Sequence, residues 1–222
     1  MKNLYLVLLL LSAFVVSASQ TPGTLEVVFS KMDEVSKTFR SVESDVERIK
    51  VTVIVDDTEI KTGKFYYTRR GKEPRVKLEL LKPEVQYLLI NMGKLQLYTP
   101  KLKQLQEIST VGQQDMVEMY MALGFGQSSQ DLKKNFEVAL GPEDVLDGQK
   151  RTVLDLKPKS SNALQSIRMW LDQKTWSAVQ IKIVERSKDY LTIKFTKVRL
   201  NAGIPDSRFK LPDLPKDVRI IR

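Results

Sequence analysis

Residues 76–108 read VKLELLKPEVQYLLINMGKLQLYTPKLKQLQEI, and they decide the fold class because their apolar side chains repeat with a period of two. In the first run, Val76, Leu78 and Leu80 alternate with two charged residues, and Pro83 then ends the strand. Two further runs flank the turn Asn91–Lys94, where Gly93 suits a positive φ. Another run follows at 104–108. Because all these connections are short, the pattern predicts neighbouring antiparallel strands.

The same period extends outward on both sides of this stretch. Upstream, Val51, Val53 and Val55 stand at every second position, Asp56 begins a turn, and residues 60–69 return as the second half of a hairpin. Downstream, further strands are predicted at 136–140, 152–156, 167–171, 176–184 and 191–195. About ten or eleven strands without a βαβ rhythm predict a mainly β (α+β) fold, an incomplete and strongly curved antiparallel barrel.

Helical periodicity marks the segments that we expect to cover this sheet. Apolar residues recur at three- and four-residue steps over 24–39, which predicts an amphipathic helix packed on the sheet. Residues 115–123 form a methionine-rich helical face, residues 124–126 (Gly-Phe-Gly) are interpreted as a flexible exit, and 131–134 as a second short helix. Two interpretations of the methionine-rich segment stay open, namely ordinary core packing and a mobile lid.

The N-terminus has the layout of a secretory signal peptide. Lys2 precedes an apolar run from Leu4 to Val16, and small residues follow at 17–19. This run is shorter than the roughly 20 apolar residues that a spanning helix needs. We therefore expect residues 1–19 to be a cleaved signal and 20–222 a single exported domain in the periplasm. Since the chain contains no cysteine, it cannot itself be lipidated as a bacterial lipoprotein is.

Composition excludes most catalytic chemistry. The chain has no histidine and no cysteine, which removes Ser-His-Asp triads, thiol nucleophiles and nearly all usual zinc sites. Ser207 and Lys210 match an S-x-x-K pattern, but in a strand-like stretch instead of at a helix start. The net charge of +9 could suit nucleic acid, an anionic membrane or an acidic partner, yet no aromatic-rich RNA-binding motif accompanies it. We expect no enzyme, no cofactor, no metal and no nucleic-acid partner.

The concave face of such a sheet is predicted to be aliphatic and to form a pocket for an acyl chain. Transfer of each methylene from water to such a surface is worth ~0.8 kcal/mol, so acyl chains could bind without a specific polar contact. If side chains fill the space completely, the same residues form only a core. The predicted lining residues are Val53, Tyr66, Val76, Leu78, Leu80, Leu95, Leu97, Met116, Met119, Tyr120, Met169 and Ile181.

One motif supplies a family resemblance. The segment from Ile90 to Pro100 (INMGKLQLYTP), followed by Gln104, is similar to the turn-strand signature of the bacterial outer-membrane lipoprotein carrier family, LolA. Gly63 before an aromatic strand and Phe209 with two later prolines agree with it. The resemblance implies an open barrel covered by helices that holds lipoprotein acyl chains. It also implies a monomer that receives its cargo from an inner-membrane ABC-type release complex and passes it to an outer-membrane receptor.

The resemblance also implies a lid latch. The arginine that holds the family's lid closed matches Arg69, whereas an insertion makes Arg70 or Arg75 alternative latches. Val76 and Leu78 stand where cavity aromatics are common in the family. Two other functions remain alternatives, a same-fold module for another lipid or glycolipid and an envelope-stress lipid sensor.

Overall fold

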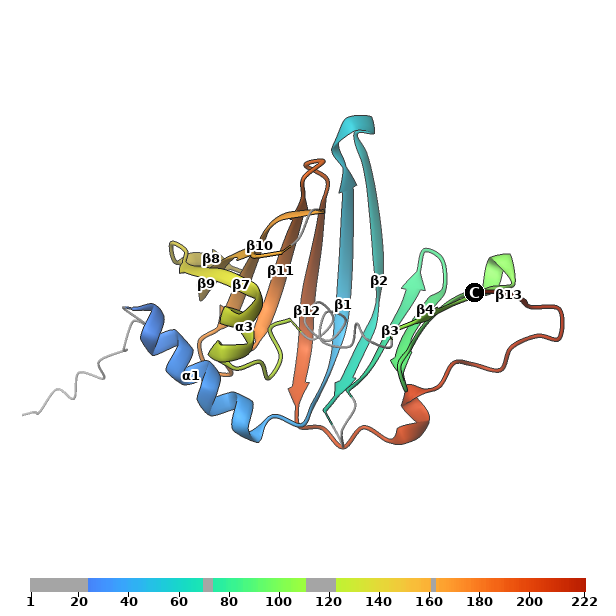
Figure 1. The fold of residues 1–222 in the computed structure, drawn as a ribbon, viewed down its shortest axis with the longest axis horizontal. Coiled ribbons are helices and arrows are strands. Elements are labelled where there is room, and N and C mark those ends of the chain that lie inside the picture. The colour runs from blue at the N-terminus through green and yellow to red at the C-terminus, as the bar shows by residue number, and fades with distance from the viewer. Residues whose placement is uncertain (1–23, 70–73, 111–122, 161–162) are drawn as a thin grey trace, which may run out of the picture.

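A single curled, unclosed sheet forms the framework of the computed structural model, which describes residues 24–69, 74–110, 123–160 and 163–222 (Figure 1). The helices are α1 (Leu25–Thr38) and α3 (Ser129–Asn135). The strands are β1 (Ser41–Thr52), β2 (Asp57–Thr68), β3 (Arg75–Lys82), β4 (Gln86–Asn91), β5 (Lys94–Thr99), β6 (Gln104–Ser109), β7 (Phe136–Leu140), β8 (Asp144–Leu146), β9 (Gln149–Pro158), β10 (Leu164–Asp172), β11 (Ala178–Glu185), β12 (Tyr190–Leu200) and β13 (Arg219–Ile221).

The strand order joins the two halves of the chain through β1. It runs β13-β6-β5-β4-β3-β2-β1-β12-β11-β10-β9-β7, with β8 attached to β9. Neighbours are antiparallel except for β13, which pairs in parallel with β6. The predicted mainly β, open-barrel fold is therefore confirmed, and the short connections produce the antiparallel neighbours expected from residues 76–108.

The strand count differs from the predicted ten or eleven, since thirteen strands occur in the described ranges. The two additional strands, β8 and β13, have three residues each, too few to show a period of two. The first hairpin also begins ten residues earlier than the valine alternation indicates. Strand β1 starts at Ser41, in a charged stretch, and residues 53–55 form a short 3-10 turn at the hairpin tip.

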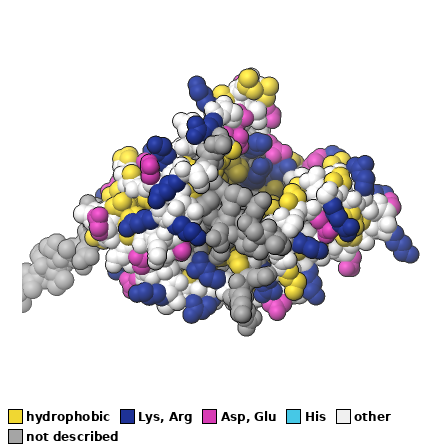
Figure 2. Space-filling model, in the orientation of Figure 1, with side chains coloured by type: hydrophobic (Ala, Val, Ile, Leu, Met, Phe, Trp, Pro, Cys, Tyr) yellow, Lys and Arg dark blue, Asp and Glu magenta, His cyan; other side chains and the backbone are white. Residues whose placement is uncertain are grey.

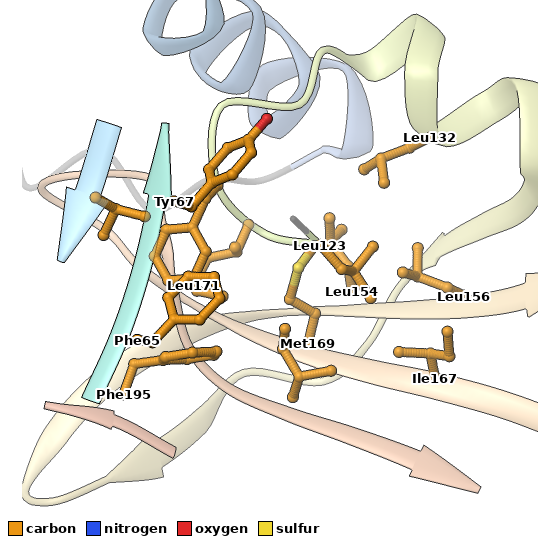
Figure 3. Close-up of a cluster of buried hydrophobic side chains, with 14 of the residues drawn as sticks. Phe65, Tyr67, Leu123, Leu132, Leu154, Leu156, Ile167, Met169, Leu171 and Phe195 are labelled. Atoms are coloured by element: carbon orange, nitrogen blue, oxygen red, sulfur yellow. The ribbon is translucent and has the colours of Figure 1, made fainter. Parts of the chain in front are cut away.

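The sheet has an inner face, against which α1 and α3 pack, and an outer face. Residues alternate between the two faces along each strand. Phe65, Tyr67 and Phe195 belong to the inner-face core, where they gather with side chains from the C-terminal strands (Figure 3). Phe209, from the segment after β12, packs on the outer face with Tyr66 and two aliphatic residues. The C-terminal segment thus crosses the back of the sheet before it ends as β13.

Gly93 and Gly63 each permit a local backbone geometry in the N-terminal half. Met92 and Gly93 have positive φ values of 51° and 69°, which is typical of a type I′ hairpin turn between β4 and β5. Gly63 faces an irregularity in the pairing of β2 with β3, and a Cβ at this position would lie 1.7 Å from the Glu79 carbonyl oxygen. Only a residue without a side chain lets the two backbones approach this closely.

Substitution Gly63→Ala should therefore destabilise the fold by about 1–3 kcal/mol, as overpacking of a filled interior does. The matched control is Gly203→Ala, because nothing lies within 4 Å of a Cβ at Gly203. Urea unfolding of both variants measures the difference. Equal midpoints for the two variants would show that the β2–β3 backbones separate at no cost.

Candidate functional site

The inner face carries a strip of aliphatic side chains that is only partly covered. Leu78 of β3 pairs with Leu88 of β4, which pairs with Leu97 of β5, and Leu95 lies next along β5. All four keep part of their surface exposed, whereas Val76 and Leu80 on β3 are buried. On the other half of the sheet, Ile183 and Ile193 are likewise half-buried, beside the buried Ile181 and Met169. The strip is therefore a partly exposed apolar surface, of a kind that an apolar ligand would cover.

Residues 123–127, Leu-Gly-Phe-Gly-Gln, lie against the centre of this face. Phe125 is 0% exposed. Its ring stacks on Phe65 at 5.8 Å and meets Phe195 edge-on at 4.9 Å between centroids. The interpretation of this segment as a flexible exit is therefore wrong, because Phe125 fills the space between the two halves of the sheet.

The two glycines of this segment allow close approach. Gly124 and Gly126 have φ of 84° and 67°, and a Cβ at Gly126 would lie 2.2 Å from the Phe39 ring. A Cβ at Gly124 would lie 2.3 Å from that of Ala178, whose backbone N–H donates to the Gly124 carbonyl at 2.9 Å. The absence of side chains at both glycines thus lets the backbone of this segment pack directly against the core.

Arg69 holds the same segment from the end of β2. Its Nη1 donates to the Gly126 carbonyl at 2.9 Å, and its Nε donates to the Tyr67 hydroxyl at 3.3 Å. Arg75 is engaged elsewhere, since it donates to Asp206 at 2.8 Å and lies 4.7 Å over the Phe209 ring. Of the three arginines considered as a latch, Arg69 contacts the segment, Arg75 is tied to the C-terminal segment, and Arg70 lies outside the described residues.

Helices α1 and α3 are fastened to each other beside the inner face. Asp33 of α1 accepts hydrogen bonds from the backbone N–H of Ser129 at 2.6 Å and from its hydroxyl at 2.8 Å. The ammonium of Lys133 lies 4.4 Å from the centroid of the Phe29 ring. A capping box between Ser128 and Asp131 starts α3. Asp33 therefore has a structural role that the sequence pattern, which suggests a solvated helix face, does not reveal.

Residues 50–212 match the family profile described as outer membrane lipoprotein carrier protein LolA. The chain belongs to this family. The match includes the inner-face strip, Arg69 and the Phe125 segment, so the geometry above is that of a LolA-type module. In the described part of the chain no helix is long and apolar enough to cross a lipid bilayer, and no group of three or more His, Cys, Asp or Glu residues is placed to hold a metal ion.

Individual relatives share the module at low identity. An uncharacterized protein of Methanocaldococcus jannaschii is 26% identical over 210 residues, 93% of this chain, and the chain spans 57% of that relative's length. An uncharacterized conserved protein from Thermus thermophilus has a TM-score of 0.57 at 13% identity, over 89% of this chain and 98% of that one. MucB has a TM-score of 0.54 at 11% identity, over 85% of this chain and 63% of that one. These structures share the fold.

The structure brings most of the predicted LolA-type lining together, with two corrections. Val76, Leu78, Leu80, Leu95, Leu97, Met169 and Ile181 belong to the inner face or its core, and Met116, Met119 and Tyr120 lie outside the described residues. Tyr66 points to the outer face, because its neighbours Phe65 and Tyr67 occupy the inner one. Val53 is 46% exposed in the turn that ends the β1–β2 hairpin, where Figure 2 shows apolar side chains at the top of the molecule.

Substitution Asp33→Ala should loosen α3 from α1, because it removes two hydrogen bonds to a carboxylate, a kind of bond with a net contribution of about 1.5–3 kcal/mol. We expect faster amide hydrogen exchange over residues 129–135. Glu34→Ala is the control, since Glu34 forms only an exposed ion pair with Lys31 within α1. Equal exchange in both variants would assign α3 to other contacts.

Proposed function

We propose that this chain is an exported, non-enzymatic carrier that binds lipoprotein acyl chains on its inner face and moves them from the inner to the outer membrane. The observation that carries the proposal is the half-buried aliphatic strip beside Phe125. A contiguous aliphatic surface that is left partly uncovered is typical of a binding site for an apolar ligand. The family match over residues 50–212 supports the lipoprotein cargo.

Phe125 determines how cargo could enter. An acyl chain of about twelve methylenes gains roughly 10 kcal/mol from burial, and removal of a buried aromatic side chain costs about 3–5 kcal/mol. Exchange of Phe125 for cargo is therefore favourable, and it leaves the aromatic pair Phe65 and Phe195 in contact with the chain. The empty state keeps residues 123–127 in place, and the loaded state releases them. Cargo shifts the equilibrium because it binds the open state only.

The remaining parts of the proposal concern the route. Residues 1–19 act as a cleaved signal peptide and 20–222 as a single monomeric domain in the periplasm. An inner-membrane ABC-type complex loads the carrier, and an outer-membrane receptor unloads it. These steps rest on the family description and on the apolar N-terminal run. No cofactor takes part.

A second candidate is a same-fold module that binds another lipid or glycolipid, or that senses mislocalised lipids. The observation that favours it is the length of the archaeal relative, in which the matched region is 57% of a longer protein. Release of a lipoprotein from spheroplasts on addition of the purified chain separates the candidates. A carrier releases the lipoprotein, whereas a binding module or sensor leaves it on the membrane.

Substitution Leu78→Glu should weaken binding of a fluorescent acyl probe about tenfold or more, because a carboxylate on the strip must lose water when the chain binds. Leu78 is half-buried, so the variant can fold with its carboxylate in solvent. The control is Leu102→Glu, an exposed leucine in the turn before β6. Mass spectrometry of lipid extracts from the purified wild type identifies the natural ligand. Equal probe affinity in the two variants would remove the strip from the site.

Substitution Arg69→Met should favour the open state, because it removes the charged hydrogen bond to Gly126, of a kind worth about 1.5–3 kcal/mol. We expect about tenfold tighter apparent binding of the acyl probe, since more of the protein is competent to bind. Arg75→Met is the matched control and should leave affinity unchanged, because Arg75 contacts Asp206 and Phe209. The same change in both variants would contradict a latch at Arg69.

A further inference from the structure

Two cations stand on the inner face at one end of the aliphatic strip. Arg48 of β1 lies directly opposite Lys61 of β2 in the antiparallel register. Arg48 is two residues from the buried Val46, and Lys61 is two residues from Gly63 on the strand that carries Phe65. Because side chains two apart share a face, both cations belong to the inner face. They stand beside the aliphatic strip on the same face.

The cations share one carboxylate. The ammonium of Lys61 lies 2.8 Å from Glu59 Oε1, and Arg48 Nη1 lies 3.0 Å from Glu59 Oε2. Lys61 also donates to the Gln86 side-chain oxygen at 2.9 Å. The side chain of Lys61 is 10% exposed and that of Arg48 is 24% exposed. The hydrogen bond from Lys61 is the main cause that lowers the pKa of Glu59, so this carboxylate stays ionised at neutral pH.

The cluster of Arg48, Glu59, Lys61 and Gln86 therefore has an excess positive charge. Two cations against one anion leave a net charge of about +1 where Lys61 is buried and Arg48 is partly exposed, so an anion that reaches the cluster is attracted by both cations. The exposed Lys50 lies opposite Glu59 and adds to this excess. Arg48 has five N–H donors and Lys61 has three, more than one carboxylate and one amide oxygen can use.

The position of Gln86 ties the cluster to the strip. Gln86 lies opposite Leu80 in the register of β3 with β4, two residues before Leu88. A ligand with its chain along Leu88 and Leu78 would therefore have its head beside Lys61. The arrangement has an apolar section and a cationic end, which is the complement of an anionic amphiphile.

A second buried lysine shows what a balanced pair looks like in this sheet. Lys77 of β3 is on the outer face, its side chain is 7% exposed, and its ammonium lies 2.8 Å from Glu79 Oε1. The burial of the lysine, the sequence spacing and the distance match those of Lys61 and Glu59, whereas Glu79 is 12% exposed and Glu59 is 41% exposed. In the outer pair, however, one cation meets one anion. The excess charge thus belongs to the inner face, where a ligand would lie.

We propose that Arg48 and Lys61 bind the anionic head group, a phosphate or carboxylate, of the amphiphile whose acyl chain lies on the aliphatic strip. This inference rests on the acyl-binding face of the proposed function and deepens its second candidate, a module for another lipid, because the acylated cysteine of a lipoprotein carries no phosphate or carboxylate head group. The head group would accept hydrogen bonds from both cations, and Glu59 would hold them in place between cargoes.

The test compares three single-chain lipids of equal chain length, namely lysophosphatidylglycerol, lysophosphatidylcholine and uncharged monoacylglycerol. The purified wild-type chain should bind the anionic lipid about tenfold more tightly than the uncharged one. Lys61→Gln and Arg48→Gln should remove this preference and leave monoacylglycerol binding intact, which also shows that each variant is folded. Lys77→Gln is the matched control and should keep the preference.

The variant Glu59→Gln should strengthen the preference for the anionic lipid over monoacylglycerol. Glu59→Gln removes the shared anion, so the anionic lipid should gain affinity relative to monoacylglycerol. A merely structural ion pair predicts no such gain. Inorganic phosphate is tested alone, because a free phosphate is the alternative source of the anion. Phosphate binding as tight as that of the anionic lipid would overturn a lipid head group as the ligand.

The outcomes separate the two proposals. Equal binding of all three lipids by the wild type, or an unchanged preference in the Lys61 and Arg48 variants, overturns the head-group site and leaves acyl binding standing. Failure of all three lipids to bind overturns the carrier proposal itself, and the head-group site with it.

Discussion

The pairing of β1 with β12 is the interaction on which the rest of the structure depends. It extends from Val42 opposite Leu200 to Val51 opposite Tyr190, so it joins strands about 140 to 160 residues apart in the chain. Apart from this ladder and the parallel pairing of β13 with β6, each half consists of antiparallel strands that lie close together in the chain. Only this ladder gives the two halves one inner face, and it places Phe195 opposite Val46, beside the strand that carries Phe65.

A sheet curled around this ladder has more apolar inner surface than α1 and α3 cover. Residues 123–127 cover part of the remaining inner surface. Phe125 occupies the centre of the face, and Arg69 forms a hydrogen bond to the backbone of this segment. The leucines of β3, β4 and β5 remain partly uncovered. The Phe125 segment thus stabilises the empty protein, and in the proposed function it is the segment that a ligand displaces from the inner face.

Local patterns predict the fold well, and contacts between distant segments explain the errors. Gly93 and α1 are predictable because a turn and an amphipathic helix depend on neighbouring residues. Val53 is misplaced because its alternation continues into a turn, and Tyr66 because three consecutive aromatic residues carry no period. Phe125 is misread because flanking glycines have two possible meanings. They indicate a flexible segment when nothing packs on them, but here Phe39 and Ala178 pack on them, and they allow close approach of the backbone.

The charge balance around a lysine likewise depends on residues that are distant in the sequence. Lys61 and Lys77 are equivalent in sequence, each two residues from a glutamate, and equivalent in burial. They differ because Arg48, from the strand that pairs with β2, joins the inner glutamate, which is also the more exposed of the two glutamates. A balanced pair on the outer face needs no further partner. An unbalanced trio beside an aliphatic strip does need one, and an anion attached to an acyl chain satisfies the charge and the apolar surface together. The polar end of the face would then set the direction in which cargo lies along the sheet.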